Sequence, residues 1–375
     1  MRVVVSAHNV VNYPEGGGHF WVYLQYVQGL RSIGCDVWWM EEFRPTGDAQ
    51  RDSARVRSFA ARLDRYGLGR QFLLYTGDGK HLEYAGTSEA CANSVFRDTD
   101  LLLNFHQAIR PCILERFRRT ALVDIDPGLL QYWMSAGVLS VAPHHLYFTT
   151  GETVGTARAT FPNCGINWIR IRPPVSLDFW PYVPEPSYNK FTTVSSWWGD
   201  DQWVEYGGEI YDNNKRASFL KFADLPRLTV QPLELALFFD ASDQEELDSM
   251  GQKGWSIRHS HEVAATPEQY QSYVQGSRGE FSCAKASCMK FQNAWLSDRT
   301  LCYLASGRPA VVQDTGPSSI LPNGLGMFRF STLEEAAGAL NAIASNYALH
   351  SRAARDLAEC FDARRVAEKI LSCCT

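Results

Sequence analysis

The sequence predicts an α/β fold with two Rossmann-like domains that face each other across a cleft. Short apolar segments typical of buried strands alternate with helical segments along the 375 residues. A proline-rich segment interrupts this alternation near the middle of the chain and leaves two parts, each of ordinary domain size. Polar residues follow most of the predicted strands, at the edge where open parallel sheets bind ligands.

Composition limits the classes of function. The formal net charge is −5 and no basic block is present, which argues against a broad nucleic-acid-binding face. The first ten residues are too short an apolar run for a signal peptide, and no stretch of about 18 apolar residues occurs. We therefore expect a cytoplasmic protein with no membrane span. The 10 cysteines include no C-x-x-C pair, so we expect free thiols and no metal site.

The first domain is expected to span residues 1–172 and to open with a βαβ unit. Residues 2–7 form a buried-type strand, 19–33 a helix with one apolar face, and 36–40 the next strand. The intervening loop contains Gly17 and Gly18, which let a backbone approach a ligand closely. Flexible glycines in a surface loop are the alternative. A helical region within 42–79 precedes further strands, predicted at 101–105, 121–125 and 146–150.

Residues 173–188 are expected to form a linker, because their prolines block regular structure. A second α/β domain then spans 189–349, with strands at 191–196, 233–239 and 255–258. The last two predicted helices are at 333–347 and 353–371. The segment 350–375 is expected to be able to cross back to the first domain.

The most informative stretch is 279–317. Ser297 is a good N-cap for a helix over 298–306, and Asp298 complements the dipole of that helix. A helix start with Arg299 in its first turn is an anion site.

A buried strand follows at 310–313. It ends in Asp314, Thr315 and Gly316, at the edge where such sheets bind ligands. The stretch as a whole therefore predicts a pocket for phosphate and sugar. An ordinary helix packed on a sheet is the alternative.

The order of these motifs resembles the donor-binding half of GT-B glycosyltransferases, in a divergent bacterial-type branch. The helix start at 297–299, the Leu-Ala-Ser-Gly-Arg-Pro turn at 304–309, the buried strand and the polar loop at 314–316 carry the resemblance. The glycine-rich loop after the first strand is similar to the acceptor domain of the same family. The resemblance implies a hexosyltransferase-type enzyme that binds a nucleotide-sugar in its second domain, with transfer in the cleft and no metal or other cofactor.

A nucleotide-sugar brings a diphosphate leaving group, whose developing charge needs cations and helix N–H groups. Arg299, Lys285 and Lys215 are the candidates, since each stands at a strand end or a helix start. Arg258 stands at a strand end where GT-B proteins often frame the base. The polar loop at 314–316 is expected to hold the sugar hydroxyls, with an ordinary Asp-x-Gly turn as the alternative.

An inverting transfer also needs a base beside the acceptor hydroxyl. The candidates are His19 at a helix start, Asp126 after a strand, and Glu152 after the next strand. Each has a structural alternative as a packed or capping residue. Asp124 and Asp126 also spell D-x-D, which binds a divalent cation in a different glycosyltransferase fold, but that interpretation leaves the second α/β domain unexplained.

One departure from the family pattern keeps other functions open. Common retaining members carry a glutamate for the nucleotide ribose at the position of Cys302, so retention or inversion cannot be carried over. A GT-B-like nucleotide-sugar epimerase and a non-catalytic nucleotide-sugar-binding protein are the alternatives. The acceptor is not determined: a small molecule, a glycan or a modified nucleic acid would all be compatible.

Overall fold

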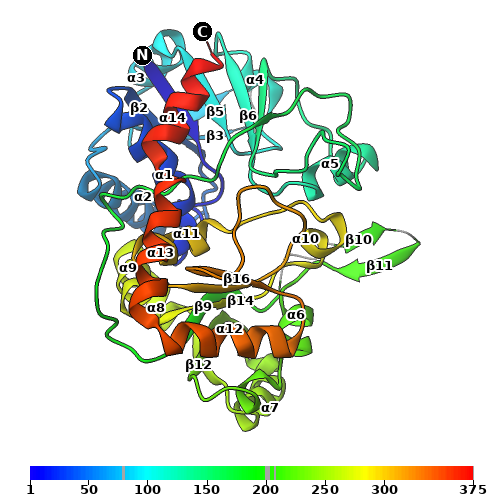
Figure 1. Ribbon diagram of the computed structural model, residues 1–375. Coiled ribbons are helices and arrows are strands. Elements are labelled where there is room, and N and C mark those ends of the chain that lie inside the picture. Colours follow the sequence, from blue (N-terminus) through cyan, green and yellow to red (C-terminus); the bar gives the residue numbers. More distant parts are fainter. Residues whose placement is uncertain (78–80, 199–202, 207, 375) are drawn as a thin grey trace.

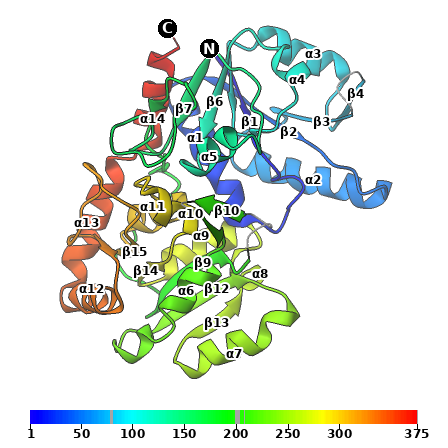
Figure 2. The ribbon, with the colours of Figure 1, turned by 90° about the vertical axis from the view of Figure 1, so that its right-hand side faces the viewer.

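The computed structural model describes residues 1–77, 81–198, 203–206 and 208–374. Two α/β domains lie one above the other, each built on its own sheet (Figures 1 and 2). Within the described residues, no helix is both long and apolar enough to cross a membrane.

The first domain contains a sheet with the strand order β4-β3-β2-β1-β5-β6-β7-β8. All neighbouring strands are parallel except β3 and β4. The strands are β1 (Arg2–Ser6), β2 (Asp36–Glu42), β3 (Phe72–Gly77), β4 (Leu82–Ala85), β5 (Leu101–Asn104), β6 (Thr120–Asp124), β7 (Leu146–Thr149) and β8 (Ile169–Arg170). The helices are α1 (Gly17–Ser32), α2 (Ala49–Arg65), α3 (Glu89–Asp98), α4 (Pro111–Leu114) and α5 (Leu129–Ser135).

The second domain contains a parallel sheet with the order β13-β12-β9-β14-β15-β16, and a separate antiparallel pair, β10 and β11. The strands are β9 (Phe191–Ser196), β10 (Trp203–Tyr206), β11 (Glu209–Asp212), β12 (Leu233–Phe238), β13 (Ser256–His259), β14 (Gly279–Ser282), β15 (Ala310–Gln313) and β16 (Met327–Phe330). The helices are α6 (Arg216–Lys221), α7 (Gln244–Gln252), α8 (His261–Ala264), α9 (Pro267–Gly276), α10 (Ala286–Phe291), α11 (Asp298–Ala305) and α12 (Leu333–Ser345), with 3-10 turns at Leu225–Arg227 and Ala241–Asp243.

The central strands are apolar on both faces because helices cover both sides of each sheet. Val3, Val4 and Val5 of β1 are fully buried, and their side chains alternate between two separate core clusters. Because the strand interiors are largely apolar, polar residues of the sheets gather at the strand ends that point toward the other domain.

The chain crosses between the domains twice. The linker leads from β8 of the first domain to the second domain. From there, α13 (Tyr347–Glu359) runs along the second domain, and α14 (Ala363–Ser372) returns to the first domain and lies beside α1, as Figure 1 shows. Val175 of the linker and the segment at Phe361–Ala363 exchange backbone hydrogen bonds, which join the two crossings. The predicted single helix at 353–371 is wrong: it is broken at 360–362, where Asp362 accepts from the N–H of Arg364 and starts α14.

Two further differences concern the first domain. Residues 72–77 form β3 and 82–85 form β4, a pair that the sequence analysis did not predict. Their composition is strand-like, but the neighbouring helix α2 gave the whole region a helical pattern.

Close packing of α1 joins the domains. A Cβ atom on Gly29 would lie 2.3 Å from the carbonyl oxygen of Ala363 in α14, and one on Gly17 would lie 2.2 Å from the carbonyl oxygen of Thr266 at the start of α9. The indole N–H of Trp21 donates to the carbonyl of Pro267 at 3.0 Å. These contacts fix α1 against both the second domain and the last helix.

Gly29→Ala is expected to destabilise the protein by about 1–3 kcal/mol, because the added methyl group must push α1 and α14 apart. The matched control is Gly338→Ala in α12, where nothing lies within 4 Å of the added Cβ. There, the higher helix propensity of alanine is expected to stabilise by about 0.5–1 kcal/mol. Urea denaturation measures both changes; an equal gain in both variants would contradict the packing argument.

Candidate active site

The strand ends of the two domains enclose three adjoining cavities. The outer cleft cavity, about 580 Å³, and the inner cleft cavity, about 350 Å³, share residues of both domains. The first-domain cavity, about 260 Å³, continues from the inner one. The residues common to the outer and inner cleft cavities are Tyr13, His19, Ser195, Ser196, Lys215, Phe238 and Lys285.

Two lysines of the second domain line both cleft cavities. Lys215 precedes α6 and Lys285 precedes α10. Burial, together with the charges of Arg299 and Lys285, lowers the pKa of Lys215 to about 7. Lys285 lies 3.9 Å from the Asp126 carboxylate across the cleft. The cleft therefore concentrates positive charge that an anion would stabilise.

His19 lies at the start of α1 and lines all three cavities. Its Nε2 lies 2.7 Å from the carbonyl oxygen of His8. Because a carbonyl can only accept, Nε2 carries the proton and donates, which leaves Nδ1 unprotonated in the neutral ring. Burial lowers the pKa of His19, so the neutral ring is favoured at pH 7.

Asp126 and Asp124 have different surroundings and therefore different roles. Asp126 lines the inner cleft and first-domain cavities with its side chain 45% exposed. Asp124 is fully buried and accepts from the amide of Gln131 and the hydroxyl of Thr149, both at 2.8 Å. Burial raises the pKa of Asp124 to about 7. Asp124 therefore holds the end of β6 in place, and the pair does not present two carboxylates to the cleft.

The start of α11 lies on the floor of the inner cleft cavity, where Ser297, Asp298 and Arg299 are lining residues. The hydroxyl of Ser297 accepts from the N–H of Arg299 at 3.3 Å. Burial raises the pKa of Asp298 despite the neighbouring charges of Arg299 and Lys215.

The Arg299 side chain differs from the expectation of an available phosphate ligand. Its Nε donates to Glu280 at 2.7 Å, its Nη1 donates to the Val194 carbonyl at 2.9 Å, and its Nη2 donates to the Ser282 hydroxyl. Glu280 is fully buried and Arg299 is 6% exposed. The guanidinium charge is therefore balanced by a buried carboxylate, and the arginine ties α11 to β14 and β9.

Gly17 and Gly18 line the inner cleft cavity, but close packing accounts for both. Gly17 meets the backbone of Thr266, and a Cβ on Gly18 would lie 2.8 Å from the ring of Tyr270 in α9. Gly17 and Gly18 were expected to let a ligand approach the backbone. They instead allow α1 to pack closely against the second domain.

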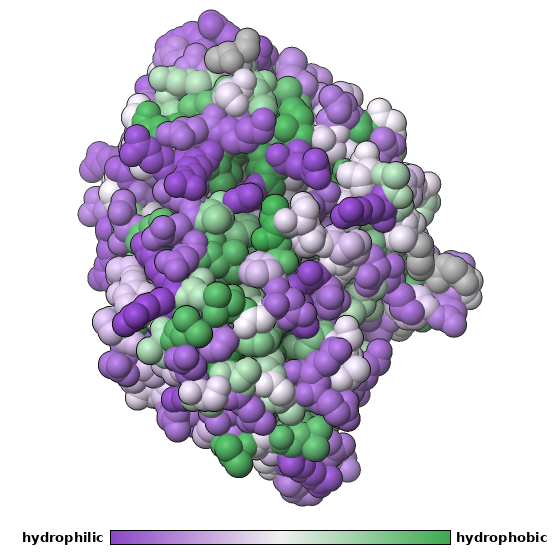
Figure 3. Space-filling view, in the orientation of Figure 1, coloured by the Kyte–Doolittle hydropathy of each residue, from purple (hydrophilic) through white to green (hydrophobic). Residues whose placement is uncertain are grey.

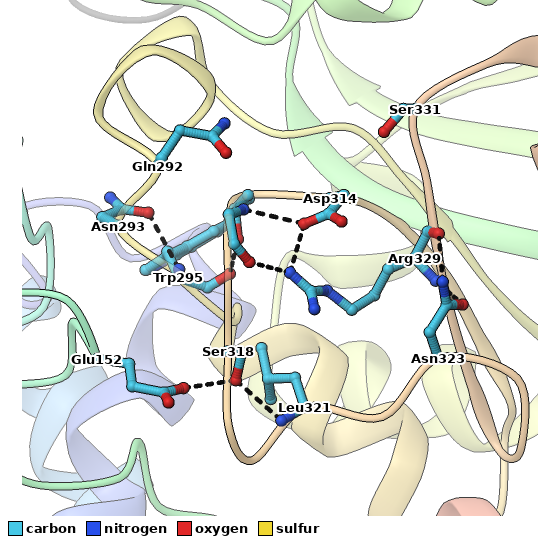
Figure 4. Close-up of polar contacts among 12 residues, drawn as sticks. Glu152, Gln292, Asn293, Trp295, Asp314, Ser318, Leu321, Asn323, Arg329 and Ser331 are labelled. Atoms are coloured by element: carbon cyan, nitrogen blue, oxygen red, sulfur yellow. Dashed lines mark hydrogen bonds and ion pairs between the residues drawn. The ribbon is translucent and has the colours of Figure 1, made fainter. Parts of the chain in front are cut away.

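The loop at 314–316 lines none of the three cavities, and Figure 4 shows its polar contacts. Asp314 pairs with Arg329 and accepts from the N–H of Gly316 at 2.9 Å, while Thr315 donates to the Trp295 carbonyl at 2.7 Å. This is the structural turn that the sequence analysis held as the alternative for Asp314, Thr315 and Gly316.

Glu152 is also placed outside the three cavities. Its carboxylate accepts from the backbone N–H of Ser319 at 2.7 Å and from the hydroxyls of Ser318 and Ser319, as Figure 4 shows for Ser318. Burial alone would raise the pKa of Glu152, but these hydrogen bonds outweigh it and lower that pKa. Glu152 therefore joins the domains, and the structure does not offer it as a base.

Arg258 lies on the surface of β13, where it forms an ion pair with Glu262 at 3.4 Å. It lines none of the three cavities.

Aromatic residues of the cleft were missed by the sequence analysis. Trp198, Phe238 and Phe239 line the outer cleft cavity. Trp198 and Phe238 are 43% and 37% exposed, which is unusual for side chains of this size. Phe238 ends β12, so its position at a strand end was the available signal.

Cys302 stands where the resemblance to GT-B glycosyltransferases implied a glutamate for the nucleotide ribose. Cys302 is buried in α11 and its sulfur lies 3.6 Å from the amide nitrogen of Gln25 in α1. It lines none of the three cavities. Among the described residues, no group of three histidine, cysteine or acidic side chains is arranged to hold a metal ion.

The fold matches known structures over its whole length. No family model and no curated protein matches the sequence. Anabaena HepE in complex with UDP-glucose aligns with a TM-score of 0.62 and 12% identity, over 100% of this chain and 99% of that chain. An alpha-glucosyltransferase in complex with UDP-glucose and DNA containing an abasic site aligns with 0.60 and 11%, also over 100% and 99%.

A third match is a glycosyltransferase involved in avilamycin A biosynthesis, with a TM-score of 0.54 and 12% identity over 100% of this chain and 97% of that chain. These neighbours have the two facing Rossmann-like domains of the GT-B glycosyltransferase fold. The chain has the same fold, and the predicted fold class is confirmed.

Arg299→Met is expected to destabilise the protein by about 3–5 kcal/mol, because it leaves the Glu280 carboxylate buried without its partner. Arg299→Met combined with Glu280→Met is expected to lie much closer to the wild type. Urea denaturation of the wild type, both single variants and the double variant measures the coupling. Additive losses would show that the pair does not act as a unit.

Lys215 is expected to make stability depend on pH above neutrality. Its pKa is about 7 when folded, against an ordinary value of 10.5, so the unfolded chain binds more protons between these values. The stability of the wild type should therefore rise with pH relative to Lys215→Met, by at most about 1.4 kcal/mol per pH unit. Denaturation at pH 6.5, 7.5 and 8.5 tests this; parallel curves for the two proteins would refute the lowered pKa.

Proposed function

We propose that this protein is a glycosyltransferase that transfers a hexosyl group from a nucleotide-sugar to an acceptor bound between its domains. One observation carries the proposal: Lys215, Lys285 and the start of α11 converge from one domain on the cavities that His19 and Asp126 line from the other. The UDP-glucose complexes of Anabaena HepE and of the alpha-glucosyltransferase support a UDP-sugar as donor.

In this proposal the donor lies along the second domain. The exposed faces of Trp198 and Phe238 would pack on the base and ribose in the outer cleft cavity, and their burial would favour binding. The diphosphate would lie inward, between Lys215 and Lys285. Since an anion favours the charged form of a neighbouring lysine, binding would raise the lowered pKa of Lys215 and bring a proton into the site.

The same cations would assist the chemical step. As the bond between the sugar's anomeric carbon and the phosphate oxygen breaks, its electron pair remains on the diphosphate. Lys215, Lys285 and the N–H groups at the start of α11 would stabilise that charge in a partly enclosed site. We propose that these groups of the chain perform the role without a bound metal.

The acceptor would lie toward the first domain, where, in an inverting transfer, a base takes its hydroxyl proton as the new bond to the anomeric carbon forms. His19 fits this role because its ring is neutral and its Nδ1 is unprotonated. Asp126 is the second candidate, since it lines the same cavities.

UDP at millimolar concentration is expected to raise the melting temperature of the wild type, because it binds only the folded state. Lys285→Met is expected to weaken UDP binding by about tenfold or more, the effect of losing a charge-assisted contact. The matched control is Arg258→Met, a surface cation of the same domain outside the cleft, which should bind as the wild type does. Equal weakening in both variants, or no shift with UDP, GDP, dTDP, ADP or CDP, would contradict the donor site.

His19→Gln is expected to lower the rate of UDP release from UDP-glucose by about 10²–10⁴-fold in the presence of an acceptor, while the UDP-induced shift stays unchanged. The rate should not change when EDTA is added. Consumption of donor only when an acceptor is present excludes an epimerase, and tight UDP binding without any turnover would favour a non-catalytic binding protein. If the His19→Gln variant kept full activity, His19 would be excluded as the base and Asp126 would become the candidate.

A further inference from the structure

A further cavity lies beside the two chain crossings and outside the cleft cavities. This hinge cavity, of about 620 Å³, is enclosed by the ends of β7 and β8, the loop at 319–320, and the join between α13 and α14. Residues of both domains therefore form its walls. Figure 3 looks onto this face, where hydrophobic side chains lie in a hollow between hydrophilic ones.

Four cationic side chains line the hinge cavity. Arg170 and Arg172 come from the end of β8, while Arg365 and Lys369 come from adjacent turns of α14 and share one face of that helix. Within the described part of the chain, none of the four forms an ion pair with a carboxylate. Positive charges from two separate segments thus converge on one cavity, where the carboxylate of Glu152, which interacts electrostatically with Arg170, offsets one of the four charges.

Backbone carbonyls orient two of these cations, Arg172 and Arg170. Nη1 of Arg172 donates to the Cys360 carbonyl at 2.6 Å, and its guanidinium lies 5.4 Å from the centre of the Phe361 ring. Arg170 donates to the Glu152 carbonyl at 3.2 Å. The guanidinium groups that flank the cavity are therefore oriented by the backbone and keep further N–H groups for a ligand.

The lining contains one carboxylate, that of Glu152, and its oxygens are occupied by Ser318 and Ser319. The apolar part of the wall is formed by Ile169, Ile171, Ile320 and Val366, and the hydroxyl-bearing residues Thr150 and Ser319 also line the cavity. Ile320 is 36% exposed although it faces this cavity. The hinge cavity thus combines an excess of positive charge, four cations against one carboxylate, with apolar side chains of which Ile320 is exposed.

We propose that the hinge cavity is a second ligand site, which binds an amphiphilic anion: a phosphate or carboxylate that carries a short hydrocarbon group. The anionic group would lie among Arg170, Arg172, Arg365 and Lys369, and the hydrocarbon group would cover the isoleucines. Thr150 and Pro173 line both this cavity and the first-domain cavity, so the two adjoin. A ligand here would therefore lie next to the reacting groups of the cleft while leaving the donor cavities free.

Decyl phosphate, kept below its critical micelle concentration, is a suitable probe for calorimetric titration of the full chain. The test variant is Arg365→Gln with Lys369→Gln, which removes two exposed charges from the cavity side of α14. The matched control is Arg364→Gln, on the same helix, whose guanidinium pairs with Glu368 and does not line the cavity. We expect binding to the wild type, at least tenfold weaker binding to the double variant, and a change of less than twofold in the control.

Inorganic phosphate is expected to bind at least tenfold more weakly than decyl phosphate, because it leaves the apolar wall uncovered. UDP binding should be the same in the wild type and the double variant, and decyl phosphate should not displace UDP. No binding of decyl phosphate to the wild type, equal loss in the control, or competition with UDP would overturn the proposal. Failure of UDP to bind any variant would count against the donor site alone.

Vesicles distinguish the two sources of such a ligand. If the protein sediments with phosphatidylglycerol vesicles and the double variant does not, the proposed site takes a membrane lipid. If decyl phosphate binds and neither protein sediments, the proposed site takes a soluble anion.

Discussion

The position of α1 is the constraint on which the rest of the molecule depends. This helix begins in the cleft with His19, packs along the sheet of its own domain, and is held by α9 on one side and α14 on the other. Close approach at Gly17 and Gly29 leaves no room for the helix to shift. The separation between the groups that the two domains present to the cleft is therefore fixed by backbone contact as well as by side-chain packing.

Charge in the cleft is divided between groups that stabilise the fold and groups that remain available. Arg299 and Glu280 neutralise each other beneath the sheet edge, and Asp124 is satisfied by hydrogen bonds at the end of β6. Among the described residues Lys215 forms no ion pair; the charge of Asp298 favours its protonated form, but burial outweighs it and lowers the pKa of Lys215. Because burial disfavours the charged form of Lys215, a neighbouring anionic ligand would stabilise that charged form and gain binding free energy from it.

The sequence was sufficient to predict the two α/β domains, many of their strands and helices, and the cap at Ser297, because these depend on local patterns. It failed where a side chain had two chemically reasonable partners. Arg299 looks the same in sequence whether it meets a phosphate or Glu280, and Glu152 looks the same whether it meets a substrate or Ser319. Lys215 and Lys285 line the cleft as expected, while Phe238 was overlooked because an aromatic residue at a strand end resembles core.

The return of α14 to α1 has a consequence for how the protein is made. The helix that covers Gly29 is synthesised after the strands of both sheets, so the first domain leaves the ribosome with one flank of α1 uncovered. Until α14 docks, that surface is open to chaperones and to other nascent chains. Completion of the first domain thus waits for the second, and the two domains mature as one unit in the cell.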